Sequence, residues 1–274
     1  MSNIVSWRKP NPHRPPGGGP SHSEAKDVPA TRFFDRMSFI GNEWIGCFVI
    51  ETSEGLIMID CLEPEQRYVD MIETGAQQLG LDLNKLKAIL ITHGHFDHYG
   101  HADYFRSKYG AKLYMSAVDE ADALSEKTWR PPGRVPLPFA MDGHIEDGDV
   151  FRLGDTAIHI VSTPGHTRGC LSFIIPVTDE GRPHLAALWG GTGVTRERSE
   201  QLDYLASSQK FRSICEQMNV DVEIATHPFV DQTPQRLAVC REIVDGVANP
   251  FVIGKEAALR YQDMFTQMCR SKMQ

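Results

Sequence analysis

From residue 31 onward the chain alternates between short apolar runs and turn residues. Runs rich in β-branched and aromatic side chains, bounded by Gly, Asn, Ser or Pro, predict strands. Longer segments with apolar residues three or four positions apart predict amphipathic helices. The predicted strands cover residues 32–40, 43–52, 56–60, 88–91, 112–115, 150–153, 157–162, 171–176, 186–189 and 221–226. The predicted helices cover residues 64–79, 101–109, 117–125 and 197–218, with two more helices after residue 226.

These elements follow the order strands, β/α alternation, strands, and β/α alternation again. That order predicts two similar halves, each with one sheet and covering helices, stacked as a four-layer α/β/β/α sandwich of the α+β class. Residues 1–30 differ, because six prolines and a run of three glycines suit neither helix nor sheet. We predict an extended arm over residues 1–30 and a single domain over residues 31–274.

Composition narrows the class of protein. With 28 basic and 36 acidic residues the net charge is −8. The sequence has no run of five or six basic residues, so we expect no nucleic-acid partner. Six cysteines occur without a Cys-x-x-Cys pair, which predicts reduced thiols. Without an apolar leader or a long apolar run, we expect a cytoplasmic protein and no membrane partner. The sequence indicates no oligomeric state.

One segment concentrates chemistry. Residues 91–101, Ile-Thr-His-Gly-His-Phe-Asp-His-Tyr-Gly-His, hold four of the eleven histidines and an aspartate directly after a predicted strand. Side chains alternate along an extended backbone, so His93, His95 and Asp97 can point one way while His98 points elsewhere. One loop can therefore serve two adjacent sites. Imidazoles crowded together without a metal would be costly, and these ligand types suit Zn²⁺.

A single loop holds too few ligands for two metals, so further histidines are expected at other strand ends. His166, in Ser-Thr-Pro-Gly-His-Thr, and His227, in Ile-Ala-Thr-His-Pro, each follow an apolar strand. Either one alone would be interpreted as an exposed or hydrogen-bonded side chain. His101 can support a ligand or simply lie on the surface at a helix start. The other five histidines are interpreted as structural or exposed: His13, His22, His144, His159 and His184.

His-x-His-x-Asp-His after a hydrophobic strand, followed by Pro-Gly-His-Thr and a strand-end histidine, resembles the metallo-β-lactamase-fold hydrolase superfamily over residues 32–250. The resemblance implies two Zn²⁺ ions and a metal-bound hydroxide that attacks a small amide or ester, with Asp97 as the catalytic residue that orients it. It assigns one metal to His93, His95 and His166, and the second to Asp97, His98 and His227.

One departure from the family pattern refines the subclass. Many members carry a bridging aspartate where residues 188–193 here read Leu-Trp-Gly-Gly-Thr-Gly, so Thr192 takes that aspartate's place. This argues against members similar to glyoxalase II and the lactonases that use the carboxylate. It resembles subclass B3 of the metallo-β-lactamases. Thr192 is a candidate for substrate binding, with Trp129 and Phe139 of the proline-rich loop 128–139, which is a flap or an ordinary connection.

We therefore predict a zinc-dependent hydrolase with a binuclear site, acting on a small-molecule substrate of the β-lactam or lactone type. The alternative is a mononuclear iron persulfide dioxygenase on the same fold, against which Thr192 counts. A nuclease fits the acidic balance poorly. A metal-binding scaffold without chemistry does not account for six ligands.

Overall fold

The computed structural model describes residues 24–126, 137–242 and 247–274. Its first sheet has seven strands in sequence order, antiparallel from β1 to β4 and parallel from β4 to β7. Its strands are β1 (Asp27–Phe34), β2 (Met37–Asn42), β3 (Gly46–Thr52), β4 (Gly55–Ile59), β5 (Leu86–Leu90), β6 (Lys112–Met115) and β7 (Gly143–His144).

The second sheet has five strands in the order β12-β11-β10-β9-β8. All neighbours in it are antiparallel except β11 and β12, which are parallel. Its strands are β8 (Val150–Leu153), β9 (Thr156–Ser162), β10 (Leu171–Asp179), β11 (Arg182–Leu188) and β12 (Val222–Ile224).

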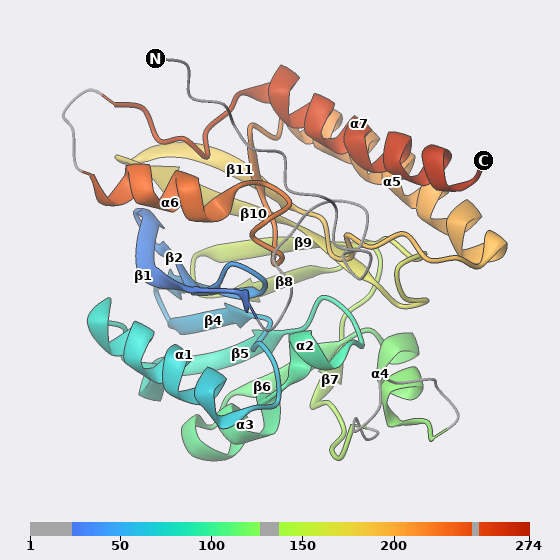
Figure 1. Ribbon diagram of the computed structural model, residues 1–274. Helices are drawn as coiled ribbons and strands as arrows, with labels where there is room; N and C mark the ends of the chain where they lie inside the picture. Colours follow the sequence, from blue (N-terminus) through green and yellow to red (C-terminus); the bar gives the residue numbers. More distant parts are fainter. Residues whose placement is uncertain (1–23, 127–136, 243–246) are drawn as a thin grey trace.

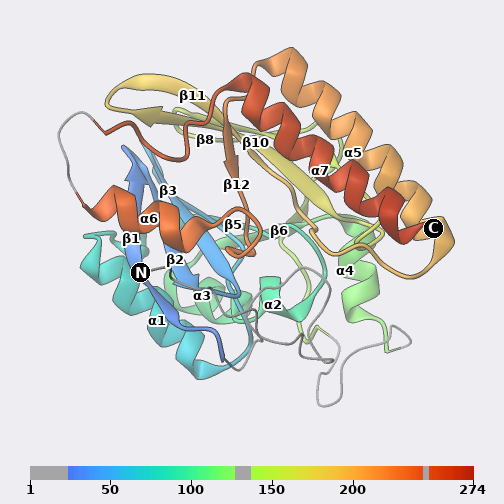
Figure 2. The same cartoon turned by 45° about the horizontal axis from the view of Figure 1, so that its top comes forward.

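Helices cover the outer faces of both sheets, which confirms the predicted four-layer sandwich (Figure 1). On the first sheet lie α1 (Gln66–Gln78) and α3 (Ala102–Tyr109), with the short α2 (Phe96–Tyr99), the 3₁₀ turn η2 (Leu83–Lys85) and α4 (Ala117–Leu124) nearby. On the second sheet α5 (Arg198–Met218) and α7 (Lys255–Lys272) run side by side (Figure 2). Helix α6 (Thr233–Arg241) packs against β1.

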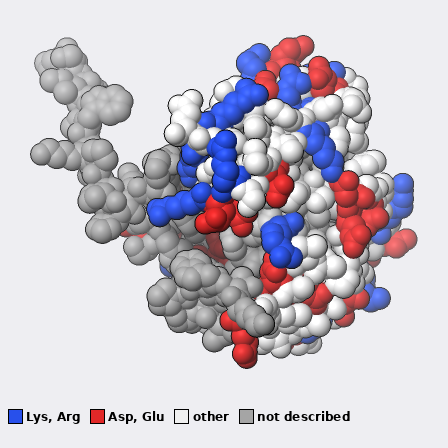
Figure 3. Space-filling model, turned by 90° about the vertical axis from the view of Figure 1, so that its right-hand side faces the viewer, with Lys and Arg blue, Asp and Glu red and all other residues white. Residues whose placement is uncertain are grey.

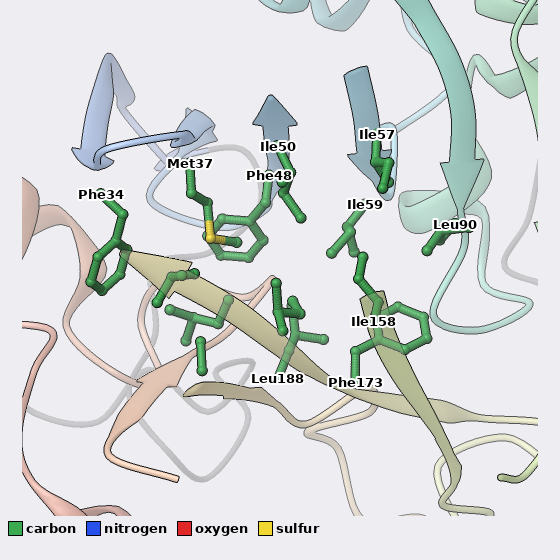
Figure 4. Packing of buried hydrophobic residues seen from close by; sticks show 14 of the residues in the cluster. Phe34, Met37, Phe48, Ile50, Ile57, Ile59, Leu90, Ile158, Phe173 and Leu188 are labelled. Carbon is green, nitrogen blue, oxygen red and sulfur yellow. The ribbon is translucent and has the colours of Figure 1, made fainter. Parts of the chain in front are cut away.

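The core between the sheets is wholly apolar. Phe48, Ile59 and Leu90 of the first sheet face Phe173 and Leu188 of the second, and each is fully buried (Figure 4). Burying one such side chain stabilises the fold by roughly 1.5–3 kcal/mol. This packing fixes the two sheets against each other, and with them the loops that leave their edges.

The first predicted strand was wrong in its bounds. Residues 32–40 do not form one strand, because a turn at Asp35 and Arg36 separates β1 from β2. The Asp35 carboxylate accepts hydrogen bonds from the amides of Glu180 and Gly181, so this turn is fixed by the β10–β11 turn far along the chain. Strand β1 also begins at Asp27, so residues 27–30 belong to the sheet.

All six cysteines lie among the described residues as free thiols. No helix of the described residues is long and apolar enough to cross a membrane.

Candidate metal centre

The predicted ligands come from loops that follow the ends of strands in both sheets. His93 and His95 follow β5, His166 follows β9, and His227 follows β12. The backbone joins these loops directly, since the amide of Leu171 donates to the carbonyl of Thr92 at 2.8 Å. Residues more than a hundred positions apart in the sequence therefore meet where these strands end.

His93, His95 and His166 form a compact first triad. Their ring centroids lie 4.6–4.8 Å apart, and one ligand atom of each lies within 4.8 Å of the others. His93 Nε2 is 3.1 Å from His95 Nδ1. Ligand atoms of one tetrahedral zinc ion are roughly 3.3–3.5 Å apart, given zinc–nitrogen bonds of about 2.0–2.1 Å. The triad is therefore close to the geometry that a single ion requires.

Asp97, His98 and His227 form a second triad beside the first. Asp97 Oδ2 lies 3.8 Å from Nε2 of both His98 and His227. The ring centroids of His93 and His98 are only 3.9 Å apart, so the two triads are adjacent. Among the described residues, these two triads are the groups of three or more potential ligands that could hold a metal ion.

Hydrogen bonds orient the ligand rings. His166 Nδ1 lies 2.6 Å from the Gly193 carbonyl, and His227 Nδ1 lies 2.8 Å from the Trp44 carbonyl. A carbonyl only accepts, so each Nδ1 carries the proton and each Nε2 presents its lone pair. His98 Nδ1 likewise lies 2.6 Å from Asp60 Oδ2. The tautomers of these three histidines thus suit metal binding through Nε2.

One buried atom tests whether a metal fits. His98 is fully buried, and its Nε2 has no hydrogen-bond partner. A buried polar nitrogen without a partner costs free energy, which a metal ion at this position would recover. Together with three imidazoles in one triad and two imidazoles and a carboxylate in the other, this fits a zinc ion at each.

Burial and neighbouring charges shift the pKa values of the candidate ligands. Burial, then the neighbouring histidines, holds the pKa of His93 well below its ordinary value. Burial likewise lowers the pKa of His227 to about 4. Burial raises the pKa of Asp97, but His98 and His227 outweigh it and leave the pKa at about 2. Burial lowers the pKa of His98, but Asp60 and Asp97 outweigh it and raise the pKa. At neutral pH His93 and His227 are therefore neutral and Asp97 is ionised, whereas the carboxylates beside His98 favour its protonated form, whose Nε2 proton a bound metal ion would replace.

Asp60 is a site residue that the sequence reasoning missed. It follows β4, is fully buried, and accepts hydrogen bonds from the amide and hydroxyl of Thr92 as well as from His98. Its backbone has a φ of 57°, in the left-handed region. The available signal was an acidic residue at the end of an apolar strand, the position where the other site residues also occur.

The three predicted substrate-binding residues have different locations. Trp129 lies outside the described residues. Phe139 is half-buried and packs among the residues around α3. The Arg106 Cζ lies over its ring, 5.3 Å from the ring centroid. Thr192 lies in the loop after β11, one residue before the carbonyl that accepts from His166, and its own carbonyl accepts a hydrogen bond from Tyr204. His101 precedes α3 as its N-cap.

Comparison with known proteins agrees with this geometry. The family model of the metallo-beta-lactamase superfamily matches residues 46–179. BJP-1, a subclass B3 metallo-beta-lactamase of Bradyrhizobium japonicum, superimposes with a TM-score of 0.78 at 25% identity, over 90% of this chain and 94% of that one. The class B3 di-zinc metallo-beta-lactamase LRA-12 from an Alaskan soil metagenome gives a TM-score of 0.76 at 21% identity, over 91% and 96%.

A curated relative has another activity. A hydroxyacylglutathione hydrolase of Thermosynechococcus vestitus is 28% identical over 73% of this chain and 76% of its own length. The chain spans only 41% and 60% of two further curated relatives, both uncharacterized proteins. The matched family model, the shared fold and the two triads show that this chain contains a metallo-beta-lactamase domain. Its family and structural neighbours place it among metal-dependent hydrolases, similar to subclass B3.

Proposed function

We propose that this protein is a dinuclear zinc hydrolase that opens a small amide or ester, with a β-lactam or a lactone as the type of substrate. The observation that carries the proposal is the pair of adjacent triads, in which Nε2 of His98, His166 and His227 is turned inward by a hydrogen bond at Nδ1. The B3 neighbours support the amide substrate, and the di-zinc neighbour supports the metal and its number.

The residues divide the work of hydrolysis. His93, His95 and His166 would hold one zinc ion, and Asp97, His98 and His227 the other. A metal held by these residues would supply Lewis-acid chemistry, namely activation of water at neutral pH and polarisation of the substrate carbonyl. Asp97, with its pKa of about 2, is ionised at neutral pH and can accept a hydrogen bond that orients the attacking water.

Thr192 and Phe139 remain our candidates for substrate contacts, with Trp129 beyond the described residues. Thr192 is favoured by its place next to Gly193, which binds His166. The hydroxyacylglutathione hydrolase relative supports a thioester as a second candidate substrate, because hydrolysis of its acyl bond uses the same attack on a carbonyl. Six free thiols support a reducing, cytoplasmic location.

The test is to purify the protein without added metal and to measure its metal content by elemental mass spectrometry, for the wild type and for His227→Ala. We expect about two zinc ions per chain, falling towards one in the variant. Wild-type protein is then assayed against β-lactams, lactones and acyl-glutathione thioesters, where the variant should lose at least 100-fold in kcat/KM. One iron per chain, unchanged in His227→Ala, would instead favour the mononuclear dioxygenase.

A further inference from the structure

Asp119 joins two parts of the chain that carry metal ligands. It lies on α4, is 1% exposed, and its carboxylate accepts three short hydrogen bonds. The Gly94 amide donates to Oδ2 at 2.7 Å, the Thr167 hydroxyl donates to Oδ2 at 2.6 Å, and the Gly169 amide donates to Oδ1 at 2.7 Å. No sequence motif pointed to this residue.

The hydrogen-bond donors to Asp119 lie next to the histidines of the first triad in the sequence. Gly94 lies between His93 and His95, and Thr167 directly follows His166. One carboxylate therefore connects the loop after β5 with the loop after β9, and these two loops supply all three histidines of the first triad. The second triad has supports of its own, namely Asp60 for His98 and the Trp44 carbonyl for His227.

The two glycines allow this connection to form. A Cβ on Gly169 would lie 2.2 Å from Ser116 Oγ and 2.6 Å from the Asp119 amide nitrogen, and a Cβ on Gly94 would lie 3.0 Å from the Asp119 carbonyl oxygen. Any side chain at Gly169 would push α4 away from the loop after β9. In the segment after β9, Thr167 and Gly169 therefore contact Asp119, while His166 between Gly165 and Thr167 belongs to the first triad.

Helix α4 holds Asp119 rigidly. Ser116 is the N-cap of the helix, and its hydroxyl accepts a hydrogen bond from the Asp119 amide at 3.1 Å. The cap directly follows β6, so the carboxylate is fixed relative to the first sheet. Burying a carboxylate costs free energy that an apolar residue of similar volume would avoid, even with hydrogen bonds to partly offset it. Stability alone therefore does not account for an acidic residue here.

We propose that Asp119 is a positioning residue for the first triad: by binding Gly94, Thr167 and Gly169 it holds His93, His95 and His166 at the separation that one zinc ion requires. This inference rests on the dinuclear zinc centre proposed above. Its consequence is selective, because loosening Asp119 should weaken zinc binding at the first triad and leave the second triad largely intact.

Asp119→Asn tests the role with almost no change in volume. The amide nitrogen of asparagine would face hydrogen-bond donors wherever it replaced a carboxylate oxygen, so at least one of the two loops must lose its contact. We expect two zinc ions of similar affinity in the wild type, and a 10–100-fold weaker affinity for one ion in the variant, measured by competition with a chromophoric chelator. Imidazole NMR should show the Nδ1–H signal of His166 broadened and that of His227 unchanged.

Matched variants keep the test decisive if Asp119→Asn folds poorly. Thr167→Val removes one donor, whereas Thr167→Ser keeps the hydroxyl, so only the valine variant should weaken the first zinc ion. Glu223→Gln changes another fully buried acidic residue, outside both triads, and should leave both affinities unchanged. Two zinc ions bound with wild-type affinity by Asp119→Asn and Thr167→Val would overturn the positioning role. Fewer than two in the wild type would overturn the dinuclear centre itself.

Discussion

At the scale of single residues, three of the candidate ligand histidines are oriented by the oxygen atom next to their Nδ1. His166 and His227 use backbone carbonyls for this purpose, whereas His98 uses the Asp60 carboxylate at 2.6 Å. A carbonyl fixes the tautomer, but a carboxylate also makes the imidazole a stronger base and ligand. Asp60 should therefore affect metal affinity at the second triad without being a ligand.

Asp60→Asn is the corresponding prediction. Asparagine can still accept from Thr92 through its oxygen, but its amide group then faces the His98 Nδ1–H, donor against donor. We expect zinc affinity at the second triad to fall by 10–100-fold, measured as zinc content after dialysis against graded chelator. Asp35→Asn, in the distant β1–β2 turn, is the control and should keep wild-type affinity. Equal affinity in the two variants would contradict the role of Asp60.

At the scale of elements, the loop after β11 approaches the first triad so closely that glycine is required. A Cβ on Gly191 would lie 2.4 Å from the His166 Cβ and 2.7 Å from its Cδ2. Gly191 is not among the glycines with positive φ, so an added methyl group would not strain its backbone. The constraint comes from the His166 side chain that packs against it.

Gly191→Ala should therefore displace His166. We expect zinc at the first triad to be lost or weakened at least tenfold, with a loss of about 1–3 kcal/mol in the free energy of unfolding. Gly80→Ala is the comparison, because Gly80 has a φ of 70° and no atom within 4 Å of an added Cβ. Its cost of about 1 kcal/mol arises from backbone strain and should leave the zinc content at two. Urea unfolding and elemental analysis of both variants measure these effects.

What could be predicted at this scale depended on whether the signal was local. The His93–His98 cluster was visible because its residues are neighbours in the chain, and His166 and His227 because each directly follows an apolar run. The turn at Asp35 was missed because apolar residues continue through it and its partners lie on the β10–β11 turn. Trp44 was missed for another reason: it contributes a backbone carbonyl, 183 positions from His227, which its side chain does not reveal.

At the scale of the whole molecule, the candidate metal ligands gather at the strand ends, while the core between the two sheets is built from apolar side chains. On the face shown in Figure 3, Lys and Arg side chains lie among Asp and Glu side chains. Several acidic residues outside the triads are nevertheless buried. Glu223 of β12 accepts a hydrogen bond from Gln262 of α7 at 2.7 Å, and Asp231, in the loop after β12, accepts hydrogen bonds from Thr233.

The raised pKa of Asp231 should make the stability of the whole fold depend on pH. Burial raises its pKa to about 6, above the ordinary value of 3.8, although Thr233 and Arg236 lower it. The folded state thus binds this proton more tightly than the unfolded state, so the fold loses stability as the pH rises from about 4 to about 6. A shift of this size corresponds to roughly 3 kcal/mol above pH 6.

Asp231→Asn removes this titration and keeps the oxygen that accepts from Thr233. In zinc-free protein at pH 7.5 we expect the variant to unfold at higher urea concentration than the wild type. Its free energy of unfolding should be higher by up to about 3 kcal/mol. The difference should shrink as the pH falls below 6 and disappear near pH 4, where the wild-type carboxyl is protonated in both states. A difference that does not change with pH would mean that the pairing of Asp231 with Arg236 offsets its burial, and that the charge is stabilised where it lies.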